Sequence, residues 1–387
     1  MKDHGVAWRG PAEGSEAPRG RATDGSAATP AVPAHARATA LGPGCVAAET
    51  GPAYAAIDLG TNNCRLLVAR ARPGAGLHVI DAFSRIVRLG EGLAFSGRLG
   101  MPAIERTIAA LKICAGKLRR HAPCITRVVA TEACRRASNG DAFLDRVARE
   151  TGLDIEVIGA GEEALLAVAG CSALLDPAHR QAIMFDIGGG STELMWLELP
   201  PPVAVAAGAP APIVLRAWTS VPAGVVSLSE RFGEAAVSVA GYHGMRDHVA
   251  AMLAEFDARH DIAAAVGAGG VQMLGSSGTV TTLAGIHLGL PRYDRSRVDG
   301  TTVDYADMRA VSRRIVEMDV AGRLAHPCIG KSRADLVVAG CAILDAILDA
   351  WPVDQVRIAD RGVREGILLG LMGVPVPIHP AAPLGRQ

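Results

Sequence analysis

The sequence predicts an α/β fold of two similar domains that face each other across a phosphate-binding cleft. Residues 54–69 (YAAIDLGTNNCRLLVA) and 181–197 (QAIMFDIGGGSTELMWL) each read as an apolar strand, an aspartate, a glycine-containing turn and a second apolar strand. The two aspartates, Asp58 and Asp186, lie far enough apart in the chain for each hairpin to belong to its own domain. Two such half-sites imply two similar domains.

The turn of the second hairpin has the composition of an anion site. Its three glycines allow consecutive backbone N–H groups to converge on an anion, and the following serine and threonine add hydroxyl donors. Asp186 could hold a hydrated divalent cation against the same anion, so the turn predicts phosphate with Mg²⁺. A plain β-turn also uses glycine, and this turn alone leaves both interpretations open. The second copy favours phosphate.

Composition excludes several classes of protein. The chain has 387 residues, of which 49% are hydrophobic and 20% charged, which is enough for one or two cores. Lys+Arg and Asp+Glu both number 39, so no net charge attracts nucleic acid or a membrane surface. No unbroken apolar run has transmembrane length. We expect a soluble, cytoplasmic protein that binds neither nucleic acid nor membranes, with a homodimer left open.

Domain boundaries follow from changes in composition. Residues 1–52 contain few large apolar side chains, so we expect a disordered extension. Residues 53–165 form the first predicted domain and residues 166–373 the second, whose closing helix could pack back on the first. The Pro-rich tail, 374–387, is expected to be frayed.

Periodicity predicts the elements of the first domain. A helix over 101–121 has apolar residues at spacings of four, three, four and three, which gives one buried face. Ser138 or Asn139 is expected to cap a helix that begins near Asp141. The other expected elements are strands over 77–87, 127–130 and 154–158, and a helix from 161 to about 175.

The second domain contains a third loop rich in glycine and hydroxyl groups, at 274–281, which opens a helix. This loop is either a site for a nucleoside or a remote phosphate, or only a capped helix start. A Pro- and Ala-rich connector is expected over 198–212, and an alanine- and leucine-rich core helix over 333–351. The remaining elements are a strand over 213–219, then a strand, turn and closing helix within 356–370.

Further motifs occur in an order that resembles the exopolyphosphatase and guanosine pentaphosphate phosphatase (Ppx/GppA) family, within the superfamily of actin, Hsp70 and sugar kinases. Besides the two hairpins, the motifs are TEACRR at 131–136, GEEA at 161–164, VPAGVVSLSERF at 221–232 and DRGVREG at 360–366. Each is short, but together they span about residues 53–372. The resemblance implies two actin-like (ribonuclease H-like) α/β domains with the phosphate-binding cleft between them.

The resemblance also implies the reaction. It is a Mg²⁺-dependent hydrolysis that releases the terminal phosphate of inorganic polyphosphate. Glu163 matches the general base, is expected to stay ionised near a helix N-terminus, and would activate water, while Arg135 would neutralise phosphate charge. The metal would be positioned by Asp58, Asp186 and Glu193. The phosphate would be bound by Gly60, Thr61, Asn62, Asn63, Gly188, Gly189, Gly190, Ser191 and Thr192.

Two residues depart from the family pattern, and simpler interpretations stay open. Leu165 stands where the family commonly has arginine, and Asn63 stands where it often has serine. Arg135 could belong to a solvated surface pair, and Glu163 could merely complement a helix dipole. For the whole protein, guanosine pentaphosphate is an alternative substrate. A kinase or ATPase that uses residues 275–279 for a nucleoside, or a non-enzymatic actin-like scaffold, are the rival classes.

The number of arginine side chains near the cleft gives an expectation about substrate preference. Long family members carry extra helical domains beyond the core, and this chain ends soon after Gly370. Its candidate cleft cations are few, and some could be paired with Asp294, Asp299, Asp360 or Glu365. The candidates are Arg135, Arg292, Arg295, Arg297, Arg361 and Arg364. We therefore expect salt-sensitive binding of long chains and distributive cleavage from the chain end.

Overall fold

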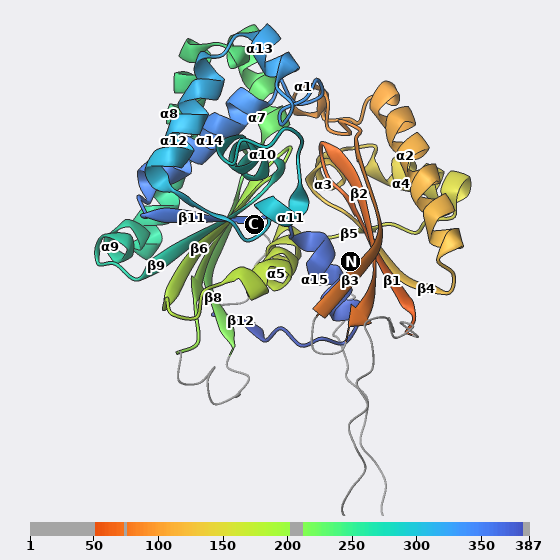
Figure 1. The fold of residues 1–387 in the computed structure, drawn as a ribbon. Coiled ribbons are helices and arrows are strands. Elements are labelled where there is room, and N and C mark those ends of the chain that lie inside the picture. The colour runs from red at the N-terminus through yellow and green to blue at the C-terminus, as the bar shows by residue number, and fades with distance from the viewer. Residues whose placement is uncertain (1–50, 73–75, 202–211, 382–387) are drawn as a thin grey trace, which may run out of the picture. The chain divides into compact units, whose positions relative to one another are not determined.

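The computed structural model describes residues 51–72, 76–201 and 212–381 (Figure 1). The predicted disordered extension therefore lies almost wholly outside the described residues. The same is true of most of the 198–212 connector and of the last six residues of the tail.

The described strands form two sheets. Sheet A has the order β3-β2-β1-β4-β5, and sheet B has the order β10-β11-β9-β6-β7-β8-β12. The strands of sheet A are β1 (Ala53–Leu59), β2 (Asn63–Arg72), β3 (Gly76–Ile86), β4 (Cys124–Ala130) and β5 (Glu156–Val157). Those of sheet B are β6 (Gln181–Ile187), β7 (Thr192–Glu198), β8 (Ile213–Val221), β9 (Val271–Ser276), β10 (Thr302–Asp304), β11 (Gln355–Ala359) and β12 (Ile378–Pro380).

The same topology occurs in both sheets. In sheet A, β1, β2 and β3 form an antiparallel meander, and β1 continues through parallel pairs to β4 and β5. In sheet B, β6, β7 and β8 form the meander, and β6 continues through parallel pairs to β9 and β11. The two hairpins recognised in the sequence therefore occupy equivalent places in two similar units.

The helices are mostly short. They are α1 (Leu93–Ser96), α2 (Met101–Arg120), α3 (Glu132–Arg136), α4 (Gly140–Thr151), α5 (Ala160–Cys171), α7 (Val225–Phe232), α8 (Val239–His260), α9 (Ile262–Gly267), α10 (Gly278–His287), α11 (Arg295–Val298), α12 (Tyr305–Glu317), α13 (Val320–Ala325), α14 (Val337–Ala350) and α15 (Val363–Leu371). The 3₁₀ turns among the described residues are η1 (Ser172–Leu174) and η2 (Gly233–Val237).

The described residues form three hydrophobic cores, and successive side chains along a strand belong to different cores. Ile57 of β1 faces α2, whereas its neighbour Ala56 faces the space between the sheets. In β6, Phe185 packs against the layer of α8, α10, α12 and α14, whereas Met184 faces sheet A. Because both faces of β1 and β6 are covered, these two strands are apolar on both sides.

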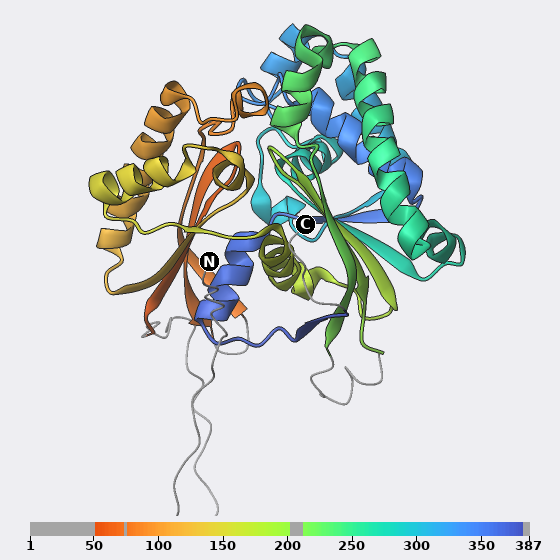
Figure 2. The same ribbon diagram turned by 180° about the vertical axis from the view of Figure 1, so that it is seen from behind.

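Helices α5 and α15 fill the space between the sheets, and Figures 1 and 2 both show them side by side. They approach so closely that only glycine fits where they meet. A Cβ added at Gly170 would lie 2.0 Å from the carbonyl oxygen of Gly362, and one added at Gly366 would lie 2.0 Å from that of Leu166. The backbone contact at these two glycines joins the two halves of the fold.

Several predicted elements need correction. The helix expected from Arg333 begins only at Val337, and Arg333 lies in the turn before it. The tail is not frayed throughout, because β12 pairs in parallel with β8, whose edge is open at that point. Asn139 is the residue before α4, but its side chain bonds the backbone of Leu99 instead of capping the helix.

No helix in the described part of the chain is long and apolar enough to cross a membrane. The predicted domain boundaries, the cytoplasmic location and the homodimer stay predictions.

The glycine contact between α5 and α15 gives a testable prediction. Gly366→Ala should lower the melting temperature by several degrees, because its Cβ would meet a backbone carbonyl that cannot move alone. Gly370→Ala in the same helix is the control, since nothing lies within 4 Å of its Cβ and alanine favours helix. Equal melting temperatures for the two variants, measured by calorimetry, would contradict the close contact.

Candidate active site

The turns of the two hairpins have the same geometry. In the first loop (residues 60–63), the N–H of Gly60 donates to the carbonyl of Asn63 at 2.9 Å. In the second loop (residues 188–191), the N–H of Gly188 donates to the carbonyl of Ser191, also at 2.9 Å. Each loop directly follows the strand that carries Asp58 or Asp186.

Neighbouring segments bind the carbonyl groups of both loops. The carbonyl of Thr61 accepts from Gly90, and that of Asn62 accepts from Val87 and Arg88. In the second loop, the first turn of α7 donates to the carbonyls of Gly188 and Gly189.

With the carbonyls engaged in this way, backbone N–H groups are left without an acceptor. No described group accepts the N–H of Thr61 or Asn62, nor that of Gly189, Gly190 or Ser191. Successive unpaired N–H groups in a tight turn form an anion-binding concavity. The two loops therefore have the backbone arrangement of a pair of anion sites.

The two loops also touch each other. A Cβ at Gly189 would lie 2.9 Å from the backbone nitrogen of Asn62, and one at Gly190 would lie 2.8 Å from Oγ1 of Thr61. Glycine is needed at both positions for this contact. The contact brings the two half-sites into one cleft.

One cleft, whose empty space together with the adjoining solvent is about 960 Å³, contains nearly all the predicted site residues. Every predicted site residue except Arg135 and Thr192 lines it. Thr192 is buried in β7, and its hydroxyl donates to the carbonyl of Ala223 at 2.6 Å. The second loop ends at Ser191, so Thr192 already belongs to the strand and does not reach the cleft.

Asp58 and Asp186 line the cleft without a hydrogen bond from any described residue. Burial raises the pKa of Asp186 to about 7, and the nearby Glu193 carboxylate adds to that shift. Burial also raises the pKa of Asp58, although Arg65 and Arg364 partly oppose it. Two unsatisfied, crowded carboxylates have the character of a site that a cation would stabilise.

The predicted metal trio is not a complete ligand cage. Among the described residues, no three His, Cys, Asp or Glu side chains gather in a metal-binding arrangement. Oε1 of Glu193 accepts hydrogen bonds from Ser191 at 2.6 Å and Ser220 at 2.8 Å, which reduces its capacity as a ligand. Asp58 and Asp186 still fit Mg²⁺, because this ion typically takes one or two carboxylates and fills its other positions with water and phosphate oxygen.

Arg135 donates a hydrogen bond to the carboxylate of Glu163 and orients it. The Arg135 guanidinium donates to Oε2 of Glu163 at 2.9 Å and to the carbonyl of Ile158 at 2.7 Å, so it fixes the carboxylate and does not itself face the cleft. Burial, increased by the charge of Glu193, raises the pKa of Glu163 well above its ordinary value, and Arg135 only partly opposes this. Burial therefore opposes the ionised state that the helix N-terminus was expected to favour. The Glu163 side chain is 14% exposed.

Two cleft arginines were missed in the sequence. Arg65 lies directly opposite Asp58 in the β1–β2 register, and Arg333 lines the cleft beside Gly278 and Thr282. Nη1 of Arg333 donates to Oγ1 of Thr282 at 3.1 Å, and no described carboxylate forms an ion pair with either arginine. Burial and the proximity of Arg65 lower the pKa of Arg333, a strain that a bound anion would relieve.

The hairpin register could have revealed Arg65, because residues opposite each other on paired strands share a face. No sequence pattern indicated that Arg333 lines the cleft, because this residue was predicted to lie in a helix.

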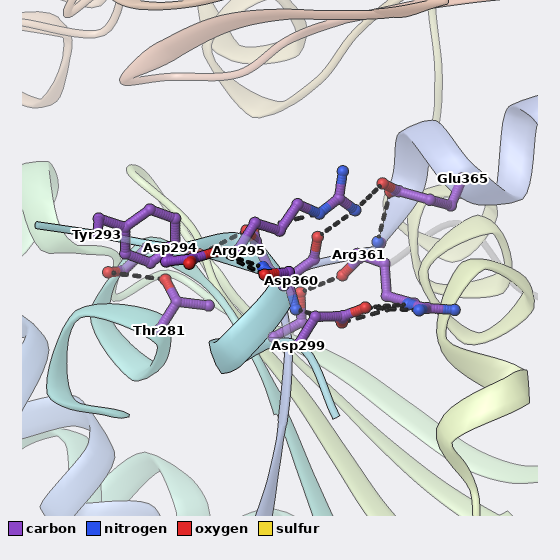
Figure 3. Close-up of polar contacts among 12 residues, drawn as sticks. Thr281, Tyr293, Asp294, Arg295, Asp299, Asp360, Arg361 and Glu365 are labelled. Atoms are coloured by element: carbon purple, nitrogen blue, oxygen red, sulfur yellow. Dashed lines mark hydrogen bonds and ion pairs between the residues drawn. The ribbon is translucent and has the colours of Figure 1, made fainter. Parts of the chain in front are cut away.

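Several arginines predicted for the cleft are engaged elsewhere, as the sequence suggested for some of them. Figure 3 shows Arg361 in a two-pronged ion pair with Asp299, and Arg295 paired with Glu365. Arg292 and Arg297 are exposed. Leu165 packs into the core between the sheets and does not line the cleft.

Comparison with known proteins agrees with this geometry. The sequence profile of the Ppx/GppA phosphatase family matches residues 67–374. The chain belongs to the Ppx/GppA phosphatase family. It is 30% identical over 336 residues to Exopolyphosphatase 2 of Mycobacterium tuberculosis, covering 82% of this chain and 98% of that protein. Membership of a phosphatase family decides against the scaffold alternative.

Solved structures of Ppx/GppA proteins have the same fold. A family member from Aquifex aeolicus is 28% identical with a TM-score of 0.65, and covers 83% of this chain and 97% of its own. An exopolyphosphatase-like protein is also 28% identical, with a TM-score of 0.71 and coverages of 82% and 98%. An exopolyphosphatase from Cytophaga hutchinsonii, at 24% identity and a TM-score of 0.69, shares the fold over 84% of this chain and 99% of its own. The predicted actin-like α/β fold is confirmed.

The strained carboxylate of Asp186 gives a prediction about stability. Its pKa is about 7 in the folded protein and about 3.9 in an unfolded chain, so its charge destabilises the fold most above pH 7, and this effect declines as the pH falls from about 7 toward about 3.9. Without divalent cations, Asp186→Asn should melt several degrees higher than the parent at pH 8, and the gap should narrow toward pH 5.

The exposed Asp145→Asn is the control for this measurement. A melting temperature of Asp186→Asn at or below that of the parent at pH 8 would show that the carboxylate is not strained.

Proposed function

We propose that this protein is an exopolyphosphatase that uses water to release the terminal phosphate of inorganic polyphosphate. The observation that carries the proposal is the pair of equivalent loops, whose unpaired N–H groups meet in one cleft beside two free aspartates. Such an arrangement fits a tetrahedral, multiply charged phosphoryl group. Similarity to a protein named Exopolyphosphatase 2 supports the choice of polyphosphate.

The order of charges along the cleft suggests which way the chain lies. The charges of Glu193, Arg135 and Asp58 affect the pKa of Glu163, whereas the charge of Arg65 affects the pKa of Arg333. We call the part of the cleft lined by Arg333, Leu336 and Val337 its arginine end. Water activated at Glu163 would attack the terminal phosphorus, and the leaving chain would extend toward Arg65 and Arg333.

In this proposal Glu163 is the general base. Arg135 holds one of its carboxylate oxygens and leaves the other for a water molecule. Its raised pKa makes the ionised form a stronger base, provided that the working pH is high enough to ionise it. Activity should therefore fall as the pH is lowered, well before the ordinary range of a glutamate is reached.

Asp58 and Asp186 would hold Mg²⁺ in this proposal. When bound, the cation would neutralise phosphate charge and lower the cost of placing a polyanion beside carboxylates. Glu193 would act mainly by orienting Ser191, to which it is hydrogen-bonded, and would contribute to the metal through water at most.

Guanosine pentaphosphate is the alternative substrate. It ends in the same kind of phosphoanhydride, and the arginine end of the cleft offers apolar surface from Leu336 and Val337, and Ser277 and Thr279 also line the cleft. That surface suits a nucleoside better than a bare phosphate chain. The same end would be the nucleotide site in a kinase, where phosphate would pass to an acceptor other than water.

A panel of substrates tests the proposal. Orthophosphate release is measured from polyphosphates of several lengths, guanosine pentaphosphate and ATP, with Mg²⁺ and with a chelator. We expect Mg²⁺-dependent release from polyphosphate, and a ladder of gradually shortened chains on gels. No release from any polyphosphate would overturn the proposal, and faster release from guanosine pentaphosphate would favour the alternative.

Glu163→Gln tests the base. The amide keeps the size and hydrogen bonding of the side chain but cannot take a proton, so kcat should fall by a factor on the order of 10² to 10⁴ while polyphosphate still binds. Glu162→Gln is the matched control, because the neighbouring Glu162 pairs with Arg127 and does not line the cleft. Full turnover by Glu163→Gln would exclude it as the base.

A further inference from the structure

Segment 87–92, which follows β3 of sheet A, contacts the sheet B side of the cleft at two points. Nη2 of Arg88 donates to Oδ1 of Asp335 at 2.9 Å, lies 2.8 Å from Oδ2, and reaches the carbonyl of Ser332 at 3.3 Å. The backbone N–H of Gly92 donates to Oε1 of Glu230 in α7 at 2.7 Å.

The backbone of Arg88 adopts a conformation that non-glycine residues rarely take. Its φ is 49°, in the left-handed region. Such a residue persists when surrounding contacts hold it, and here both its backbone and its side chain are held. The N–H of Arg88 donates to Asn62 at 3.0 Å, while its guanidinium binds Asp335.

The two ends of this contact lie at functional parts of the cleft. At one end, segment 87–92 binds the carbonyls of Thr61 and Asn62 and thereby leaves the N–H groups of the first loop free for an anion. At the other end, Ser332 and Asp335 flank Arg333, the cleft arginine. A single side chain thus connects the first loop to the position of Arg333.

We propose that Arg88 and Asp335, assisted by the Gly92–Glu230 hydrogen bond, form a clasp across the cleft that positions Arg333 relative to the first phosphate loop. Arg88 is a positioning residue in this role, because it acts through the loop and Arg333. The proposal rests on the proposed function for its kinetic consequence. The clasp should set how tightly the chain of phosphates next to the cleaved bond is held, and it should affect the chemical step little.

Kinetics on polyphosphate give the first test. Arg88→Ala and Asp335→Ala should each raise KM about threefold to tenfold, with kcat within about twofold, in keeping with a half-exposed ion pair. The double variant should be no worse than either single one, because both remove the same contact. Arg88→Lys keeps the charge and should recover part of the affinity.

The control is Glu91→Ala. Glu91 lies in the same segment and pairs with Arg106, but that pair does not cross the cleft. Wild-type KM for Arg88→Ala, an equal rise in KM for Glu91→Ala, or additive effects in the double variant would each overturn the clasp.

Hydrogen exchange tests the clasp without relying on activity. In Arg88→Ala, the hydrogen-bonded amides of Gly60, Val87 and Gly90 and those of residues 330–336 should exchange several times faster than in the parent, while those of α2 should be unchanged. Unchanged exchange in both segments would overturn the clasp. If the parent releases no phosphate from polyphosphate but the exchange changes as expected, the proposed function fails and the clasp stands.

Discussion

The chemistry of this protein depends on the orientation of carbonyl groups in two four-residue turns. Each turn is closed by one hydrogen bond between its first and last residues. Segment 87–90 binds the carbonyls of Thr61 and Asn62, and the start of α7 binds those of Gly188 and Gly189. Because peptide groups are planar, carbonyls that point outward leave the opposite N–H groups pointing inward. Phosphate affinity in this account is therefore built by parts of the fold outside the glycine motifs.

The duplication explains why two weak motifs make one strong site. Either loop alone would offer a few N–H groups, which is common in turns. The equivalent topology of sheets A and B places both loops at the same end of their strands, and the glycine contact of α5 with α15 brings the two units together. The loops then touch at Gly189 and Gly190, where no other residue fits. Burial in the resulting cleft raises the pKa of Glu163 and of Asp186, which connects the fold directly to the acid–base properties of the site.

The sequence alone predicted the elements that depend on patterns of neighbouring residues. Strand–turn–strand patterns located both hairpins, and the spacing of apolar residues located α2 almost to the residue. It was insufficient where long-range contacts decide. Arg333 read as the start of a helix, but the turn before α14 presents it to the cleft, and Arg135 turned out to support Glu163 instead of facing phosphate. The raised pKa of Glu163 could not be predicted for the same reason, because burial and the proximity of Glu193 are not visible in the sequence whereas the helix N-terminus is.

The central claim is that the two loops hold a terminal phosphoryl group for attack by water. The most direct test is hydrolysis of polyphosphate in water enriched in ¹⁸O, with the position of the label followed by mass spectrometry. Attack on the terminal phosphorus predicts one ¹⁸O atom in each released orthophosphate and none in the shortened chain. Label at the new chain end, or transfer of unlabelled phosphate to an acceptor, would contradict the account.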